Sequence, residues 1–71
     1  MSTTKKLTYE LAVNTPHGTK LVFAGSQYPF RGMLDDDHPC HFTHCYIEDE
    51  PGHVDIIRFD SLRISKKAIR Q

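Results

Sequence analysis

The chain has 71 residues, with nine Lys and Arg against nine Asp and Glu, and therefore no net charge at neutral pH. This length predicts one small domain, residues 1–71, with a modest core. No apolar run is long enough to span a membrane and residues 1–13 lack the apolar segment of a signal peptide, so we expect a cytoplasmic protein. Zero net charge argues against a nonspecific nucleic-acid binder, which usually carries a basic excess.

The first predicted element is a short helix. Residues 1–6 are polar and are expected to be flexible. Residues 7–13 place apolar side chains both at helical spacing and in alternation, so we predict a helix, with a strand as the alternative. Thr3 or Thr4 is the expected N-cap, and the segment ends before Pro16.

Short strands joined by tight turns follow the helix. Residues 20–24 and 28–34 have strand composition, and residues 25–27 form the reversal between them. Gly32 predicts a bulge or a sharp bend in the second of these strands. Residues 35–39 form a polar loop.

A hairpin dominates the second half of the chain. Residues 42–48 combine aromatic and β-branched side chains, which suit a half-buried pleated surface. Residues 54–59 form the second strand of this hairpin, with four apolar side chains in six residues. Pro51 and Gly52 supply the backbone angles that the turn between these strands needs. Residues 66–71 are basic and are expected to be flexible.

These elements predict a mainly β fold: a small SH3-like or Sm-like antiparallel barrel of four to five strands with a short N-terminal helix. The segments LVFAG and FRGML resemble the Sm fold of the Hfq family. Residues 10–12 (ELA) and 58–62 (RFDSL) are similar to the runs before and at the end of the barrel in Rho-binding antiterminators, the Rof family. The resemblance covers residues 7–64 and implies a regulator of transcription termination. The Tyr-Lys-His signature of Hfq is missing, so Hfq-type uridine binding is not implied.

The main functional prediction is a non-enzymatic regulatory protein with an acidic face. Two acidic runs in one small domain favour an electrostatic contact surface. The expected partner is a larger nucleic-acid-handling protein such as Rho. The predicted contact residues are Asp35, Asp36, Asp37, Glu48, Asp49 and Glu50.

The first alternative is an Sm-like RNA-binding protein that forms a ring. An aromatic residue and an arginine on one strand edge can stack an unpaired base, and basic residues can contact phosphates. The candidate residues are Tyr28, Arg31, Arg63 and Lys66. The plain structural interpretation is that Tyr28 only covers a sheet edge.

The second alternative is a zinc-binding module or a thiol enzyme. Cys40, His41, His44 and Cys45, preceded by His38, supply the atoms that zinc prefers, but their spacing is not a recurring zinc pattern. Strand alternation would place His44 and Cys45 on opposite faces. Cys40 beside His41 or His44 is a candidate nucleophile pair. The plain interpretation is that Cys45 is a small core residue.

Overall fold

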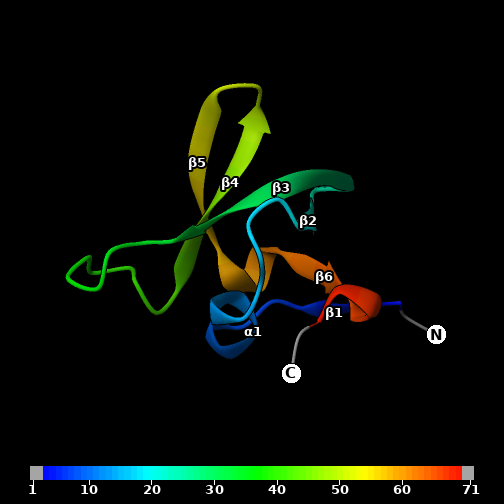
Figure 1. The fold of residues 1–71 in the computed structure, drawn as a ribbon, viewed down its shortest axis with the longest axis horizontal. Coiled ribbons are helices and arrows are strands. Elements are labelled where there is room, and N and C mark those ends of the chain that lie inside the picture. Colours follow the sequence, from blue (N-terminus) through cyan, green and yellow to red (C-terminus); the bar gives the residue numbers. More distant parts are fainter. Residues whose placement is uncertain (1–2, 70–71) are drawn as a thin grey trace.

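The computed structural model describes residues 3–69, which form one six-stranded antiparallel sheet with a short helix beneath it (Figure 1). The strand order is β1-β6-β2-β3-β4-β5, and the sheet is open, with β1 and β5 at its two ends. Two 3₁₀ turns, η1 and η2, flank the last strand. The elements are β1 (Thr4–Lys6), α1 (Tyr9–Val13), β2 (Lys20–Phe23), β3 (Ser26–Met33), β4 (His44–Glu50), β5 (His53–Arg58), η1 (Phe59–Ser61), β6 (Arg63–Ser65) and η2 (Lys66–Ala68).

The mainly β fold and the short N-terminal helix are confirmed, but the structure has six strands where four to five were predicted. β1 and β6 lie outside the four predicted strand ranges; β1 falls in the segment expected to be flexible, and the two strands pair with each other. The other predicted flexible end contains η2, while residues 1–2 and 70–71 lie outside the described residues. The N-cap of α1 is Thr8, not Thr3 or Thr4, because its Oγ1 accepts a hydrogen bond from the Leu11 N–H at 3.2 Å.

Residues with positive φ angles set the shape of the first hairpin, β2 and β3. The reversal between β2 and β3 falls at Ala24 and Gly25, whose φ angles are 51° and 82°, and so begins one residue before the predicted turn. Two consecutive positive φ angles match the twist of a two-residue hairpin. The register of β3 against β4 shifts between Phe30 and Met33, so the bulge predicted at Gly32 is confirmed.

The predicted second hairpin is confirmed with shifted bounds. Residues 38–44 make turns, in which the His44 N–H donates to the Cys40 carbonyl at 2.9 Å, so β4 begins at His44. The strand alternation predicted for residues 42–48 therefore applies only from His44 onward. Within β4, Cys45 and Ile47 face the core, and the half-buried His44 and Tyr46 face away from it.

The core lies on the inner face of the curved sheet and is closed by α1 and η1. β5, in the segment that the sequence predicts as an apolar strand, contributes little to it: Val54 and Ile56 are 47% and 40% exposed. This exposure follows from the position of β5 at the end of the sheet, where β4 is its only neighbour in the strand order. The buried cluster consists of Leu7, Ala12, Leu21, Phe30, Cys45, Ile47, Phe59, Leu62 and Ile64.

Candidate functional site

The two predicted acidic runs lie at opposite ends of β4 (Figure 1). Residues 35–37 belong to the loop that precedes this strand, and residues 48–50 form its far end. β4 has seven residues, so its two ends are about 20 Å apart at the usual rise per residue. The six acidic residues therefore do not form the single face that the sequence predicts.

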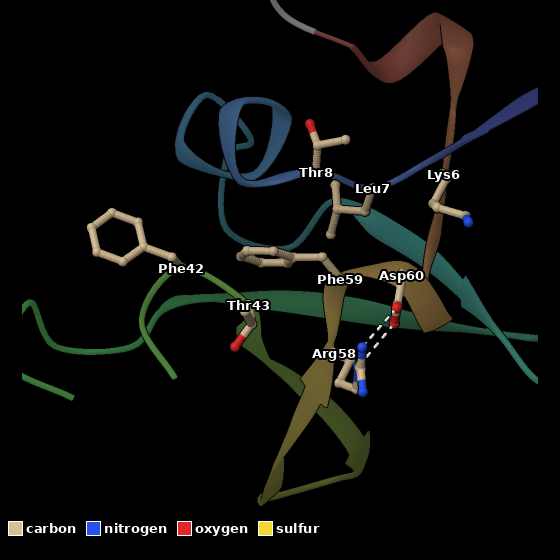
Figure 2. A pocket seen from close by; sticks show the side chains of 8 residues that line it. All are labelled: Lys6, Leu7, Thr8, Phe42, Thr43, Arg58, Phe59 and Asp60. Atoms are coloured by element: carbon tan, nitrogen blue, oxygen red, sulfur yellow. Dashed lines mark hydrogen bonds and ion pairs between the residues drawn. The ribbon is translucent and has the colours of Figure 1, made fainter. Parts of the chain in front are cut away.

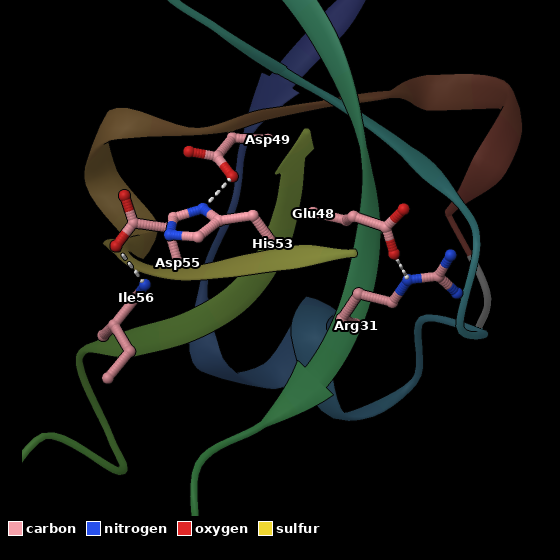
Figure 3. A network of polar contacts seen from close by, with 6 residues as sticks. All are labelled: Arg31, Glu48, Asp49, His53, Asp55 and Ile56. Carbon is pink, nitrogen blue, oxygen red and sulfur yellow. Dashed lines mark hydrogen bonds and ion pairs between the residues drawn. The ribbon is translucent and has the colours of Figure 1, made fainter. Parts of the chain in front are cut away.

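The acidic residues at the far end of β4 are already paired with basic side chains (Figure 3). Arg31 Nε donates to Glu48 Oε1 at 2.8 Å, and His53 Nδ1 lies 2.5 Å from Asp49 Oδ1. The hydrogen bond with His53 lowers the pKa of Asp49, and the same bond raises the pKa of His53. Two of the three acidic side chains at this end, Glu48 and Asp49, therefore already have a partner within the chain.

A second feature of this end is a shallow pocket beside Tyr28. The pairing of β3 with β4 extends only to Phe30 and Ile47 among the described residues, and the two hairpins diverge beyond that point. The gap forms a pocket of about 280 Å³ that Tyr28 and Pro29 line together with residues 48–50. The structure thus brings two residues of the predicted RNA site, Tyr28 and Arg31, next to half of the predicted acidic site.

The aspartates of the other run, residues 35–37, are exposed and uncompensated. Among residues 3–69, they form no ion pair with a Lys or Arg side chain. The nearest basic atom is Nε2 of His41, 3.7 Å from Oδ1 of Asp36, whose side chain is fully exposed. We call this run together with Phe42 the acidic loop.

His41 holds the acidic loop in place. This buried side chain contacts the Leu34 carbonyl through Nδ1 at 2.8 Å, and its Nε2 lies 3.2 Å from the Tyr9 hydroxyl on α1. A carbonyl oxygen only accepts hydrogen bonds, so Nδ1 carries the hydrogen, and in the neutral ring Nε2 accepts from Tyr9. The loop is therefore tied both to the end of β3 and to the helix.

The same anchor presents an exposed aromatic ring. The Phe42 ring lies 4.7 Å from the His41 ring and 5.0 Å from the Tyr9 ring, measured between centroids. Even so, 67% of Phe42 is exposed. The sequence predicts Phe42 in a strand and indicates neither Phe42 nor Tyr9 as a site residue. The available signal was an aromatic residue directly after the histidines of a polar loop.

The four residues of the predicted RNA site are not on one face. Tyr28 lies in the same row of the sheet as the buried Leu21 and Ile64 and therefore faces the core side. Arg31 is on the opposite face of β3 and pairs with Glu48. Arg63 Nε donates to Thr4 Oγ1 at 2.8 Å, and the exposed Lys66 begins η2.

The predicted zinc ligands are not gathered around one point. Among residues 3–69, no group of three or more His, Cys, Asp or Glu side chains is arranged to hold a metal ion. Cys45 is fully buried, and burial raises the pKa of its thiol to about 12. His44 Nδ1 lies 2.6 Å from Thr43 Oγ1, and His38 Nδ1 accepts from the Cys40 N–H at 3.0 Å.

Comparison with known proteins adds no assignment. The chain matches no protein-family model, no curated protein and no solved structure. Within residues 3–69, no helix is long and apolar enough to cross a membrane.

Proposed function

We propose that this protein is a non-enzymatic regulatory binding protein whose acidic loop contacts a basic surface of a larger nucleic-acid-handling protein, such as a Rho-type termination factor. The observation that carries the proposal is the presence of three uncompensated carboxylates, Asp35, Asp36 and Asp37, beside the exposed ring of Phe42. The acidic residues 48–50 are a weaker candidate, because Glu48 and Asp49 already pair with Arg31 and His53.

The chemistry of the acidic loop suits a partner that binds nucleic acid. Proteins that bind single strands combine cationic grooves with aromatic or arginine platforms that stack bases. Carboxylates can pair with the cations of such a groove, and the ring of Phe42 can stack on an arginine or an aromatic side chain. The loop therefore offers a substitute for both the phosphates and a base, and we expect it to compete with the nucleic acid.

The proposal includes a finer assignment of the fold as an open relative of Sm-like barrels. Its support is the helix that precedes the sheet, the 3₁₀ turn η1 between β5 and β6, and the pairing of β6 with β2. The Rof-like residues 58–62 occupy the end of β5, η1 and the residue that follows it. Closure of the barrel is not required for the proposed contact, because the acidic loop lies outside the sheet.

The test measures association with purified Rho hexamer by biolayer interferometry, with and without a pyrimidine-rich RNA competitor. Replacing Asp36 and Asp37 by lysine should slow association about tenfold or more and reduce its salt dependence. Glu50→Lys is the matched control, since it reverses an exposed acidic residue at the far end of β4. Equal effects of both changes, or no binding of Rho by the unmodified protein, would refute the proposal.

A further inference from the structure

The outer edge of β5 has unused hydrogen-bonding groups. The Phe59 N–H donates to the Thr43 carbonyl at 2.9 Å, which fixes the register of the β4–β5 ladder at this pair. Bonding alternates along an antiparallel ladder, so the next residues of β5 that face β4 are Ile57 and Asp55. The alternate residues of β5, Val54, Ile56 and Arg58, therefore direct their N–H and C=O groups away from β4, toward the open edge.

The side chains along this edge are apolar, and one of its backbone N–H groups is bonded to a neighbouring side chain. Val54 and Ile56 are among the exposed large apolar side chains of residues 3–69. The Ile56 N–H donates to Oδ1 of the neighbouring Asp55 at 2.9 Å, a bond visible in Figure 3. Native edge strands are usually blunted by charge, bulges or a covering element. A bond from an adjacent, exposed side chain is easily exchanged for a bond from an incoming strand.

A pocket of about 270 Å³ lies at the end of this edge (Figure 2). The connection from β1 to α1, residues 6–8, forms one wall, and residues 58–60 form another. The buried Leu7 and Phe59 provide apolar surface, and Thr43 and the exposed Phe42 complete the rim. Both terminal strands of the open sheet reach this pocket, because Lys6 ends β1 and Arg58 ends β5.

The charge at the pocket is positive. Arg58 is paired with Asp60 through two bonds, Nε to Oδ1 at 3.1 Å and Nη2 to Oδ2 at 2.9 Å, so this pair is close to neutral. Lys6 forms no ion pair among the described residues. The rim therefore carries one uncompensated cation next to an apolar surface.

We propose that the β5 edge and this pocket together bind an extended segment of a partner protein, which adds a strand beside β5. The backbone groups of Ile56 and Arg58 would bond the incoming main chain, and the pocket would take one large apolar side chain. A carboxylate next to that side chain would pair with Lys6. This surface goes beyond the acidic loop, because it selects an acidic and apolar segment where the loop selects a basic surface.

A second copy of this chain fits the edge less well. A two-fold pairing of β5 centred on Asp55 would place two Asp55 carboxylates opposite each other, which is unfavourable for like charges. Centring the pairing on Ile56 would place Asp55 opposite Ile57 of the other copy, so that a carboxylate loses water against an apolar side chain. A segment with an apolar residue opposite Asp55 meets the same cost, so we expect a polar or basic residue at that position.

The test selects binders from a displayed library of random peptides with the full chain as bait, and then titrates the best synthetic peptide into ¹⁵N-labelled protein. We expect enrichment of an apolar residue beside an acidic one, and slower hydrogen exchange at the Ile56 and Arg58 amides. Lys6→Glu should weaken binding of the peptide about tenfold or more. Lys67→Glu is the matched control, since Lys67 is an exposed lysine on η2, outside the pocket lining.

The outcomes separate this inference from the proposed function. Failure to enrich any peptide would overturn the inference, as would equal binding by the Lys6→Glu and Lys67→Glu proteins. Amide shifts at β5 that depend on protein concentration without peptide would indicate self-association and would also overturn it. Replacing Asp36 and Asp37 by lysine should leave peptide binding unchanged. Weaker Rho binding with unchanged peptide binding in that variant is the result expected if both surfaces act separately. Unchanged Rho binding would contradict only the acidic loop, and loss of peptide binding in that variant would contradict the β5 site.

Discussion

Replacing His41 by alanine tests the anchor of the acidic loop. The change removes the ring that contacts the Leu34 carbonyl at 2.8 Å and the Tyr9 hydroxyl at 3.2 Å. Leu34 is buried, so its carbonyl loses a partner in a site with little access to water. A buried acceptor without a partner costs about 1–3 kcal/mol, and the lost ring volume adds roughly 1 kcal/mol. We therefore expect His41→Ala to lower the free energy of unfolding by about 2–4 kcal/mol.

This loss is large for so short a chain, whose total stability is roughly 4–10 kcal/mol at typical values per residue. Urea unfolding followed by circular dichroism measures it directly. His44→Ala is the control, because the contact of His44 with Thr43 is exposed, and we expect it to cost less than about 1 kcal/mol. Equal effects of the two substitutions would refute the anchoring role of His41. Weaker association with the basic partner, although the aspartates are unchanged, is the expected functional result.

Three further predictions concern the backbone, the pH dependence and the thiols. Ala24→Gly should raise the free energy of unfolding by up to about 1 kcal/mol in urea melts, because Ala24 has a φ of 51°. Asp49→Asn should move the NMR-measured pKa of His53 down toward its ordinary 6.5. The pair stabilises the fold most between the ordinary values of 3.8 and 6.5, and its contribution falls as pH rises through the raised pKa of His53 or drops through the lowered pKa of Asp49. Mass spectrometry should find Cys45 alkylated only as fast as the protein unfolds, with or without chelator, whereas a rate that rises with chelator would instead support a metal site.

The local elements of the fold were predictable because their causes are local. Pro51 and Gly52 indicate the hairpin turn, Gly32 indicates the bulge, and the spacing of residues 7–13 indicates a short helix. The strand β1 was not predictable, because its polar residues have no strand pattern and are held by pairing with β6 at the other end of the chain. The exposure of the apolar side chains of β5 was also not predictable. Apolar residues indicate that burial is favourable, but they do not indicate whether a neighbouring element is present to bury them.

The sequence also could not predict which acidic residues of the candidate site have a basic partner. As sequence, residues 35–37 and 48–50 are equivalent acidic runs in a polar context. What distinguishes them is Arg31, which lies on β3 and reaches Glu48 only because β3 and β4 pair side by side. The first run follows β3 into a loop, where the nearest basic atom belongs to a histidine already bonded to Leu34 and Tyr9. A carboxylate that has its own counter-ion must give it up before it can bind a partner, and this cost offsets most of what the new pair contributes. Uncompensated charge on a loop fixed by a buried side chain has no such cost, and for this reason the acidic loop is the surface on which we expect recognition to depend.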